Sequence, residues 1–156
     1  SVDLRLSSRI SSRHKGARGM YQIYFLSITT ILLAGVALAF ERLNERVRIG
    51  SFFNVELFSS INFRLGLGVV TLLVGIFQFL TVAPGDIPVV GDLIPALTGI
   101  FLGGILIVQY YQAKATVESG FVTTLDRIFV QNASNFGVIG IIIAVIHFLL
   151  HRVLFL

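Results

Sequence analysis

The sequence predicts an all-α membrane protein, a four-span transmembrane helical bundle with two interfacial amphipathic helices. Composition is the first reason, since 55% of the 156 residues are hydrophobic and 13% are charged, against about 25% charged in an average soluble protein. The second reason is that Asp, Glu, Lys and Arg are absent from residues 19–40, 65–85, 93–113 and 128–151. Each of these stretches is long enough to cross a hydrocarbon core of about 30 Å as a helix.

Prolines and capping residues set the limits of the spans. Pro84 ends the second span because proline cannot continue a helix without losing a hydrogen bond. Asp92 is placed to cap the third span, and Pro95 is tolerated in its first turn. Tyr110 and Tyr111 fit the far interface of that span. The expected spans are about 21–40, 65–82, 93–112 and 136–155.

Two further segments are too polar and too short to cross the membrane. Residues 52–63 alternate large apolar groups such as Phe52 and Phe58 with polar ones. Residues 121–130 carry an apolar stripe of helical period, with Asp126 and Arg127 on the opposite side. We therefore expect two helices that lie along the membrane interface, on the side away from the termini.

The chain divides into a basic juxtamembrane leader, residues 1–19, and a four-helix transmembrane domain, residues 20–156. Serines are interleaved with the basic residues of the leader, and only one acidic residue, Asp3, accompanies them. This pattern favours contact with anionic lipid headgroups over contact with nucleic acid. The predicted lipid-surface residues are Arg5, Arg9, Arg13, Lys15 and Arg18.

An even number of spans places both termini on one side of the membrane. Each side then receives six Lys and Arg residues, so the positive-inside count is tied. The five basic residues beside the first span favour cytoplasmic termini. We expect a bacterial inner membrane. An organelle membrane is the alternative, because an Arg- and Ser-rich leader starting at Ser1 also fits the remnant of a transit peptide.

Small residues at spacings of four mark faces on which helices can approach closely. The third span contains Gly99 and Gly103, a GxxxG pair followed by Gly104. The hydrophobic effect does not hold helices together in lipid, so van der Waals packing at close approach has to stabilise their association. These faces serve either packing within one bundle or association with another chain. The predicted helix-packing residues are Gly35, Ala39, Gly99, Gly103, Gly104, Gly137, Gly140 and Ala144.

Three polar side chains in the second and fourth spans form a candidate polar or ligand site. His147 and His151 are four residues apart and share one helix face. Their functional interpretation is a haem or quinone contact or a proton relay. The simpler interpretation is a hydrogen bond to a carbonyl and a position near the headgroups. Gln78 lies well inside the second span, where an interhelical hydrogen bond accounts for it.

The loop between the second and third spans adds two carboxylates to this candidate site. Asp86 and Asp92 stand in a stretch that holds all three prolines. They would bind a cation or load protons, but turn and cap chemistry explains Asp92 without a ligand. The spacing of a calcium-binding loop is absent from the stretch.

The remaining motifs favour a protein that is not an enzyme. The sequence has no cysteine, no nucleophile elbow, no phosphate loop and no His-Glu-x-x-His. We expect no metal and no required cofactor. The sequence thus predicts a non-catalytic structural or assembly subunit of a membrane complex, packed against itself or other membrane subunits. The alternative is a small oligomeric channel or transporter with a polar route near Gln78, His147 and the Asp86/Asp92 turn.

Overall fold

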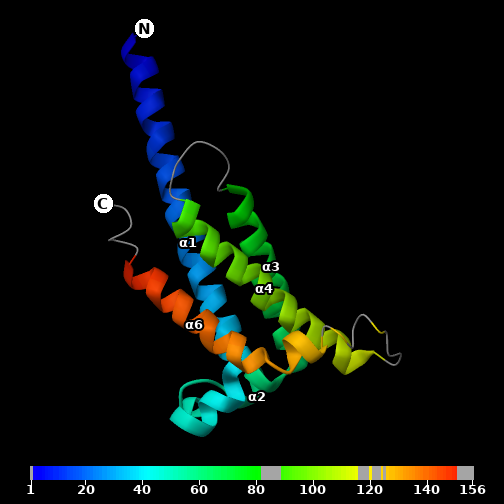
Figure 1. Ribbon diagram of the computed structural model, residues 1–156. Coiled ribbons are helices and arrows are strands. Elements are labelled where there is room, and N and C mark those ends of the chain that lie inside the picture. Colours follow the sequence, from blue (N-terminus) through cyan, green and yellow to red (C-terminus); the bar gives the residue numbers. More distant parts are fainter. Residues whose placement is uncertain (1, 82–88, 116–119, 121–123, 125, 151–156) are drawn as a thin grey trace.

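The computed structural model describes residues 2–81, 89–115, 120, 124 and 126–150, and these are almost entirely helical (Figure 1). The described part of the chain contains no β-strand, so the prediction of an all-helical protein is confirmed. The helices are α1 (Val2–Val47), η1 (Ile49–Ser51), α2 (Val55–Ser59), α3 (Ile61–Thr81), α4 (Val89–Lys114), the π-helical turn η2 (Asp126–Val130) and α6 (Ala133–Leu150).

Within the described residues, three helices are long and apolar enough to cross a membrane. The apolar segments are Gln22–Val47 of α1, Ile61–Leu80 of α3 and Leu93–Lys114 of α4. In α6 the apolar segment Ala133–Leu149 is shorter, about 25 Å at 1.5 Å per residue. The fourth span therefore stays a prediction.

Several helix boundaries differ from the sequence expectation. Helix α4 begins at Val89, so Asp92 lies inside the helix and is not its N-cap, and Pro95 stands in the helix interior and not in the first turn. Helix α1 begins at Val2 and has no break before Val47, so the backbone of the basic leader continues into the first apolar segment. Residues 52–63 do not form one interfacial helix. The backbone is extended at Asn54, whose side chain caps α2, and again at Ser60, after which α3 starts. Of the second predicted interfacial helix, residues 121–123 and 125 lie outside the described residues, and η2 covers the rest.

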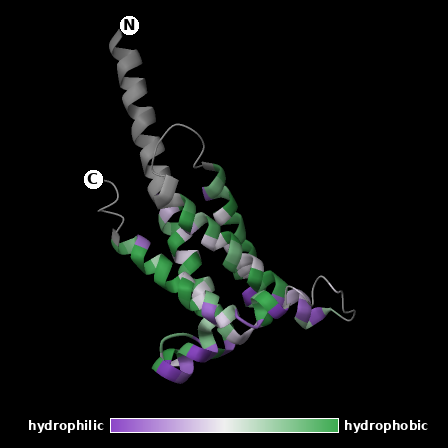
Figure 2. Ribbon diagram, in the orientation of Figure 1, coloured by the Kyte–Doolittle hydropathy of each residue, from purple (hydrophilic) through white to green (hydrophobic). Residues whose placement is uncertain are grey.

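The bundle consists of two antiparallel helix pairs. Helices α3 and α4 form the most extensive contact, and α1 pairs with α6 (Figure 1). Helix α1 also touches α3 and α4, so it is the central element and its apolar segment is the most buried of the three. Figure 2 shows hydrophobic residues along the helices of the bundle and polar residues gathered at the end that carries α2.

Glycines allow the two pairs to pack backbone against backbone. A Cβ atom placed on Gly103 of α4 would lie 2.7 Å from the Gly68 carbonyl oxygen of α3. One placed on Gly75 would lie 2.8 Å from the Ile100 amide nitrogen. Between α1 and α6, a Cβ on Gly137 would lie 2.6 Å from the Gly35 carbonyl oxygen. Both interfaces are thus closed to any larger side chain at these positions.

We predict that Gly103→Ala destabilises the bundle whereas Gly104→Ala does not. The added methyl group at 103 meets backbone atoms of α3, and such overpacking costs about 1–3 kcal/mol. A Cβ on the adjacent Gly104 meets no atom of another described helix within 4 Å, so this variant is a matched control with the same change in helix propensity. Unfolding by denaturant in detergent micelles measures the difference. Equal stability of the two variants would show that the close α3–α4 contact is absent in the membrane protein.

Candidate functional site

Polar side chains of α1 and α3 meet in the interior of the bundle. The Ser27 hydroxyl donates a hydrogen bond to the Gln78 side-chain oxygen, and both side chains are almost fully buried. About two helical turns from Gln78 on α3, the Thr71 side chain is completely buried and donates to the Leu67 carbonyl at 2.7 Å. The Thr71 hydroxyl also lies 3.4 Å from the Thr30 carbonyl oxygen. These polar groups therefore find their partners inside the chain, where water is excluded.

Arg64 lies in the first turn of α3 and joins α2, α1 and α4. Its Nε donates to the Phe58 carbonyl at 3.0 Å, and Nη2 donates to the Ala37 carbonyl at 2.8 Å. A longer contact of 3.5 Å runs from Nη1 to the Gln109 side-chain oxygen. The guanidinium group supplies several donors in a fixed planar geometry, which suits it to bridge three helices. The donors of Arg64 thus serve carbonyl and amide oxygens of the chain itself.

An aromatic cluster attaches α2 to the end of the bundle. Phe58 is buried and stacks on Phe40 of α1 with ring centroids 5.4 Å apart. Phe53 and Phe63 meet the Phe58 ring edge to face, both at 5.2 Å. Because the Phe58 carbonyl is also held by Arg64, the short helix α2 is fixed by ring contacts and by hydrogen bonds together.

The predicted ligand residues do not come together among the described parts of the chain. His147 Nδ1 lies 3.0 Å from the Ile143 carbonyl oxygen of its own helix, and the Tyr24 hydroxyl donates to the His147 carbonyl at 2.7 Å. Gln78 bonds Ser27 on α1 instead. Asp86 and His151 lie outside the described residues, and for Asp92 only the backbone, in α4, is described.

The described residues offer no ready metal centre. No three His, Asp or Glu side chains among them gather closely enough to hold an ion. The predicted lipid-surface residues of the leader belong to α1, but their side chains are not described, so their role stays a prediction.

Most of the small residues predicted for helix packing lie at contacts inside the chain. Gly35 and Gly137 face each other, Ala39 and Ala144 are buried, and Gly140 receives the side chain of Leu102. On α4, Gly103 touches α3, and a Cβ placed on Gly99 would lie 3.5 Å from the Gly75 Cα atom. Gly104 faces no other described helix.

Sequence reasoning missed the partners of these small residues on α3. Gly68, Thr71 and Gly75 repeat a small residue at spacings of three and four along one helix face. That pattern is of the same kind as those singled out on the other spans, and it would have identified the face that receives α4.

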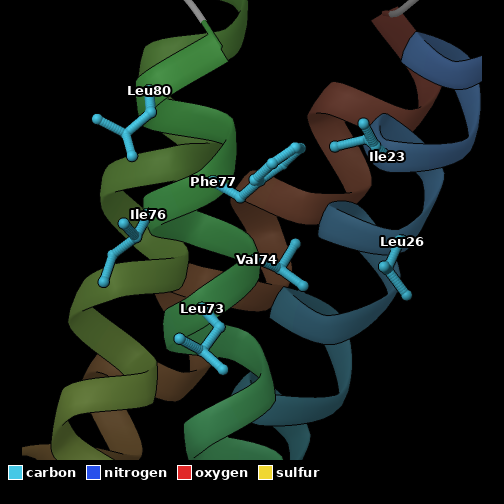
Figure 3. A pocket seen from close by; sticks show the side chains of 7 residues that line it. All are labelled: Ile23, Leu26, Leu73, Val74, Ile76, Phe77 and Leu80. Carbon is cyan, nitrogen blue, oxygen red and sulfur yellow. The ribbon is translucent and has the colours of Figure 1, made fainter.

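Two apolar grooves run along the outside of the bundle. The first has a volume of about 520 Å³ and lies between α1 and α3 (Figure 3). The second, of about 500 Å³, lies between α4 and α6 and is lined by Phe101, Phe136 and Ile139 among others. Neither lining contains a charged side chain, so the grooves fit acyl chains or apolar side chains. The first groove is lined by Ile23, Leu26, Leu73, Val74, Ile76, Phe77 and Leu80.

Comparison with known proteins gives a family but no activity. A family model for a domain of unknown function matches residues 20–147, most of the chain and all three long apolar segments. The chain belongs to that family. No curated protein and no solved structure matches the chain. The family match begins after the basic leader, so the helical bundle is the part that the family shares.

We predict that Arg64→Lys loosens α2 from the bundle. A lysine ammonium cannot reach three acceptors in different directions, and hydrogen bonds from a charged group contribute about 1.5–3 kcal/mol each. Hydrogen exchange of the α2 amides should become faster while exchange in α4 changes little.

Arg42→Lys is the matched control for this variant. The Arg42 side chain is exposed and bonds the Asn135 side chain, and exposed polar pairs contribute at most about 1 kcal/mol. If α2 exchanges at the same rate in both variants, the bridging role of Arg64 is wrong.

Proposed function

We propose that this chain is a four-span integral membrane protein that acts as a non-catalytic structural or assembly subunit. The observation that carries the proposal is that the buried polar side chains described inside the apolar helices are bonded within the chain, as in the pair Ser27 and Gln78 and the bridge from Arg64. The one exception among the described residues is the buried Ser134 hydroxyl in the first turn of α6, which has no partner. Groups committed to internal hydrogen bonds are poorly suited to bind a substrate, because each bond would first have to be broken in an environment without water.

The outer faces of the bundle support a role in packing. Large apolar side chains are exposed along α3 and α6, including Leu80 at 65% and Leu149 at 67%. Lipid covers such side chains well, and so does an apolar helix of another subunit. Between helices in a membrane, shape complementarity decides which of the two is preferred. The grooves beside α3 and between α4 and α6 offer the concave surface that a partner helix would need.

Substitution of Gly104 can distinguish an effect on association from an effect on folding. It stands beside the internal contact of Gly103, but a Cβ placed there has no described atom within 4 Å apart from its chain neighbours and the backbone of α4. A bulky residue at 104 therefore leaves the bundle intact and blocks only the close approach of a second helix.

We predict that gentle detergent extraction yields particles heavier than one chain, and that Gly104→Leu reduces them to single chains with an unchanged thermal midpoint. Native mass spectrometry of the wild-type and variant proteins measures both species. Ile94→Val, a mild change at an exposed position of the same helix that lines neither groove, is the control. A wild-type protein found only as single chains without partners would refute the subunit role.

The alternative function, a small channel or transporter, makes a different prediction for the same preparations. Its polar route would need Gln78 to face a water-filled path, but Gln78 is 3% exposed and bonds Ser27. We therefore expect no flux of ions or small solutes through the protein reconstituted in liposomes. Flux that is lost in Gln78→Leu would favour the channel.

The four-span topology has its own test, because the chain lacks cysteine. We predict that single cysteines at Ser51 and Thr124 react with an impermeant maleimide from one side of the membrane, and that cysteines at Ser12 and Leu156 react from the other. Both Ser51 and Thr124 are exposed in the structure. Labelling of position 156 from the same side as 124 would show that α6 does not cross the membrane.

A further inference from the structure

The segment that links α1 to α3 makes a sharp turn with an unusual residue at its corner. Here the elbow is defined as residues 46–59, which comprise the end of α1, η1 and α2. Arg48 has φ 54° and ψ 44°, and it is the one non-glycine residue with positive φ among the described residues. Helices commonly end at such a left-handed residue, and glycine is the usual choice because a side chain strains this conformation. The chain carries an arginine at a corner where glycine would fit better.

The elbow lies at the level where the apolar part of the bundle ends. Phe40 is the last apolar residue of α1 before Glu41, and Phe58 of α2 stacks on it at 5.4 Å. Arg64 holds α2 at the level of Phe40, because it donates hydrogen bonds both to the Phe58 carbonyl and to the Ala37 carbonyl of α1. Helix α1 thus runs past this border and the chain then returns to it, which keeps α2 beside the end of the apolar part of the bundle.

The elbow exposes large apolar side chains although it is firmly attached. Phe52 is 86% exposed and Val47 is 65% exposed, while Val55 and Leu57 are each 45% exposed. Phe58 alone of the elbow side chains is buried. Apolar groups exposed next to the end of membrane helices are those that enter the boundary between headgroups and acyl chains.

The elbow also carries two arginines that are free to bind an external anion. Arg46 and Arg48 are exposed, and neither makes an ion pair with any described residue. Glu56 is the one carboxylate within residues 46–59, so the elbow has a net charge of +1. An arginine guanidinium binds phosphate oxygens in pairs. Both residues follow Phe40 along the chain, and arginine side chains are long enough to extend toward headgroups from the edge of an apolar region.

We propose that the elbow is a docking surface for anionic phospholipids, in which Phe52, Val55 and Leu57 enter the acyl-chain boundary and Arg46 and Arg48 bind headgroup phosphates. This inference rests on the proposed membrane location of the bundle. It assigns lipid binding to the end of the molecule opposite the basic leader. It also explains Arg48, since the energy of binding phosphate offsets the strain of its backbone.

A single tryptophan can report on the lipids around the elbow, because the natural chain contains none. Phe52→Trp places this reporter at the most exposed apolar position of the elbow. The full chain is reconstituted in vesicles of phosphatidylcholine that contain an equal fraction of either brominated phosphatidylglycerol or brominated phosphatidylcholine. Bromine quenches only nearby tryptophan, so lipids bound by the leader at the opposite end do not contribute.

The expected result is blue-shifted emission and quenching that is about two- to fivefold stronger with the brominated anionic lipid, since each arginine near an anionic surface raises local affinity by about fivefold at low salt. Arg46→Gln with Arg48→Gln should abolish the preference but keep the blue shift. Arg42→Gln removes a neighbouring charge whose side chain is committed to Asn135, and it should leave the preference largely unchanged.

Other results would overturn the proposal in distinguishable ways. Blue-shifted emission with equal quenching by the two lipids would place the elbow in the membrane surface without selectivity for anionic lipid. Emission typical of water, with no quenching by either lipid, would show that the elbow stands away from the bilayer. Blue-shifted emission without quenching by either lipid would mean that a protein covers it. None of these results depends on whether the chain forms a subunit of a complex.

Discussion

Close contact between helix backbones is the constraint on which the rest of this structure depends. Lipid tails are as apolar as leucine, so helices in a membrane gain little by hiding apolar side chains from them and must instead gain contact area with one another. Gly68 and Gly103 supply that contact between α3 and α4, and Gly35 and Gly137 supply it between α1 and α6. With both pairs closed in this way, α1 is surrounded by three helices and becomes the centre of the bundle.

Polar groups then specify how the two pairs meet. Ser27 and Gln78 bond across α1 and α3 at a place where an unpaired amide would be costly. Arg64 acts at the end of the same interface and directs its donors to carbonyls of α1 and α2. A bundle held only by apolar contacts would tolerate sliding and rotation of its helices. These directional bonds give one register, and among the described residues they leave one buried side-chain polar atom, the Ser134 hydroxyl, without a partner.

The use of glycine inside the chain changes how association with a partner has to be understood. Small-residue faces serve equally well within one bundle and between bundles, and here most of them are occupied internally. Contact with another subunit would then involve the bulky outer faces of α3 and α6, the two grooves, and Gly104. The elbow at the opposite end from the termini adds a surface of different character, in which exposed apolar groups accompany free arginines.

The sequence by itself determined the helical class and the position of the three long apolar segments, because the absence of charge over about 20 residues permits almost no other structure in a membrane. It also showed the spacing of small residues around Gly35, Gly103 and Gly137, since that spacing is local. Their partners depended on the tertiary structure, because spacing along one helix does not say which other helix it faces.

The hydrogen-bond partners of Arg64 also depended on the tertiary structure. Its charge is plain in the sequence, but the carbonyls of Ala37 and Phe58 that receive it are brought near only by folding. The backbone at Arg48 was likewise decided by tertiary structure, since no local pattern predicts a left-handed arginine.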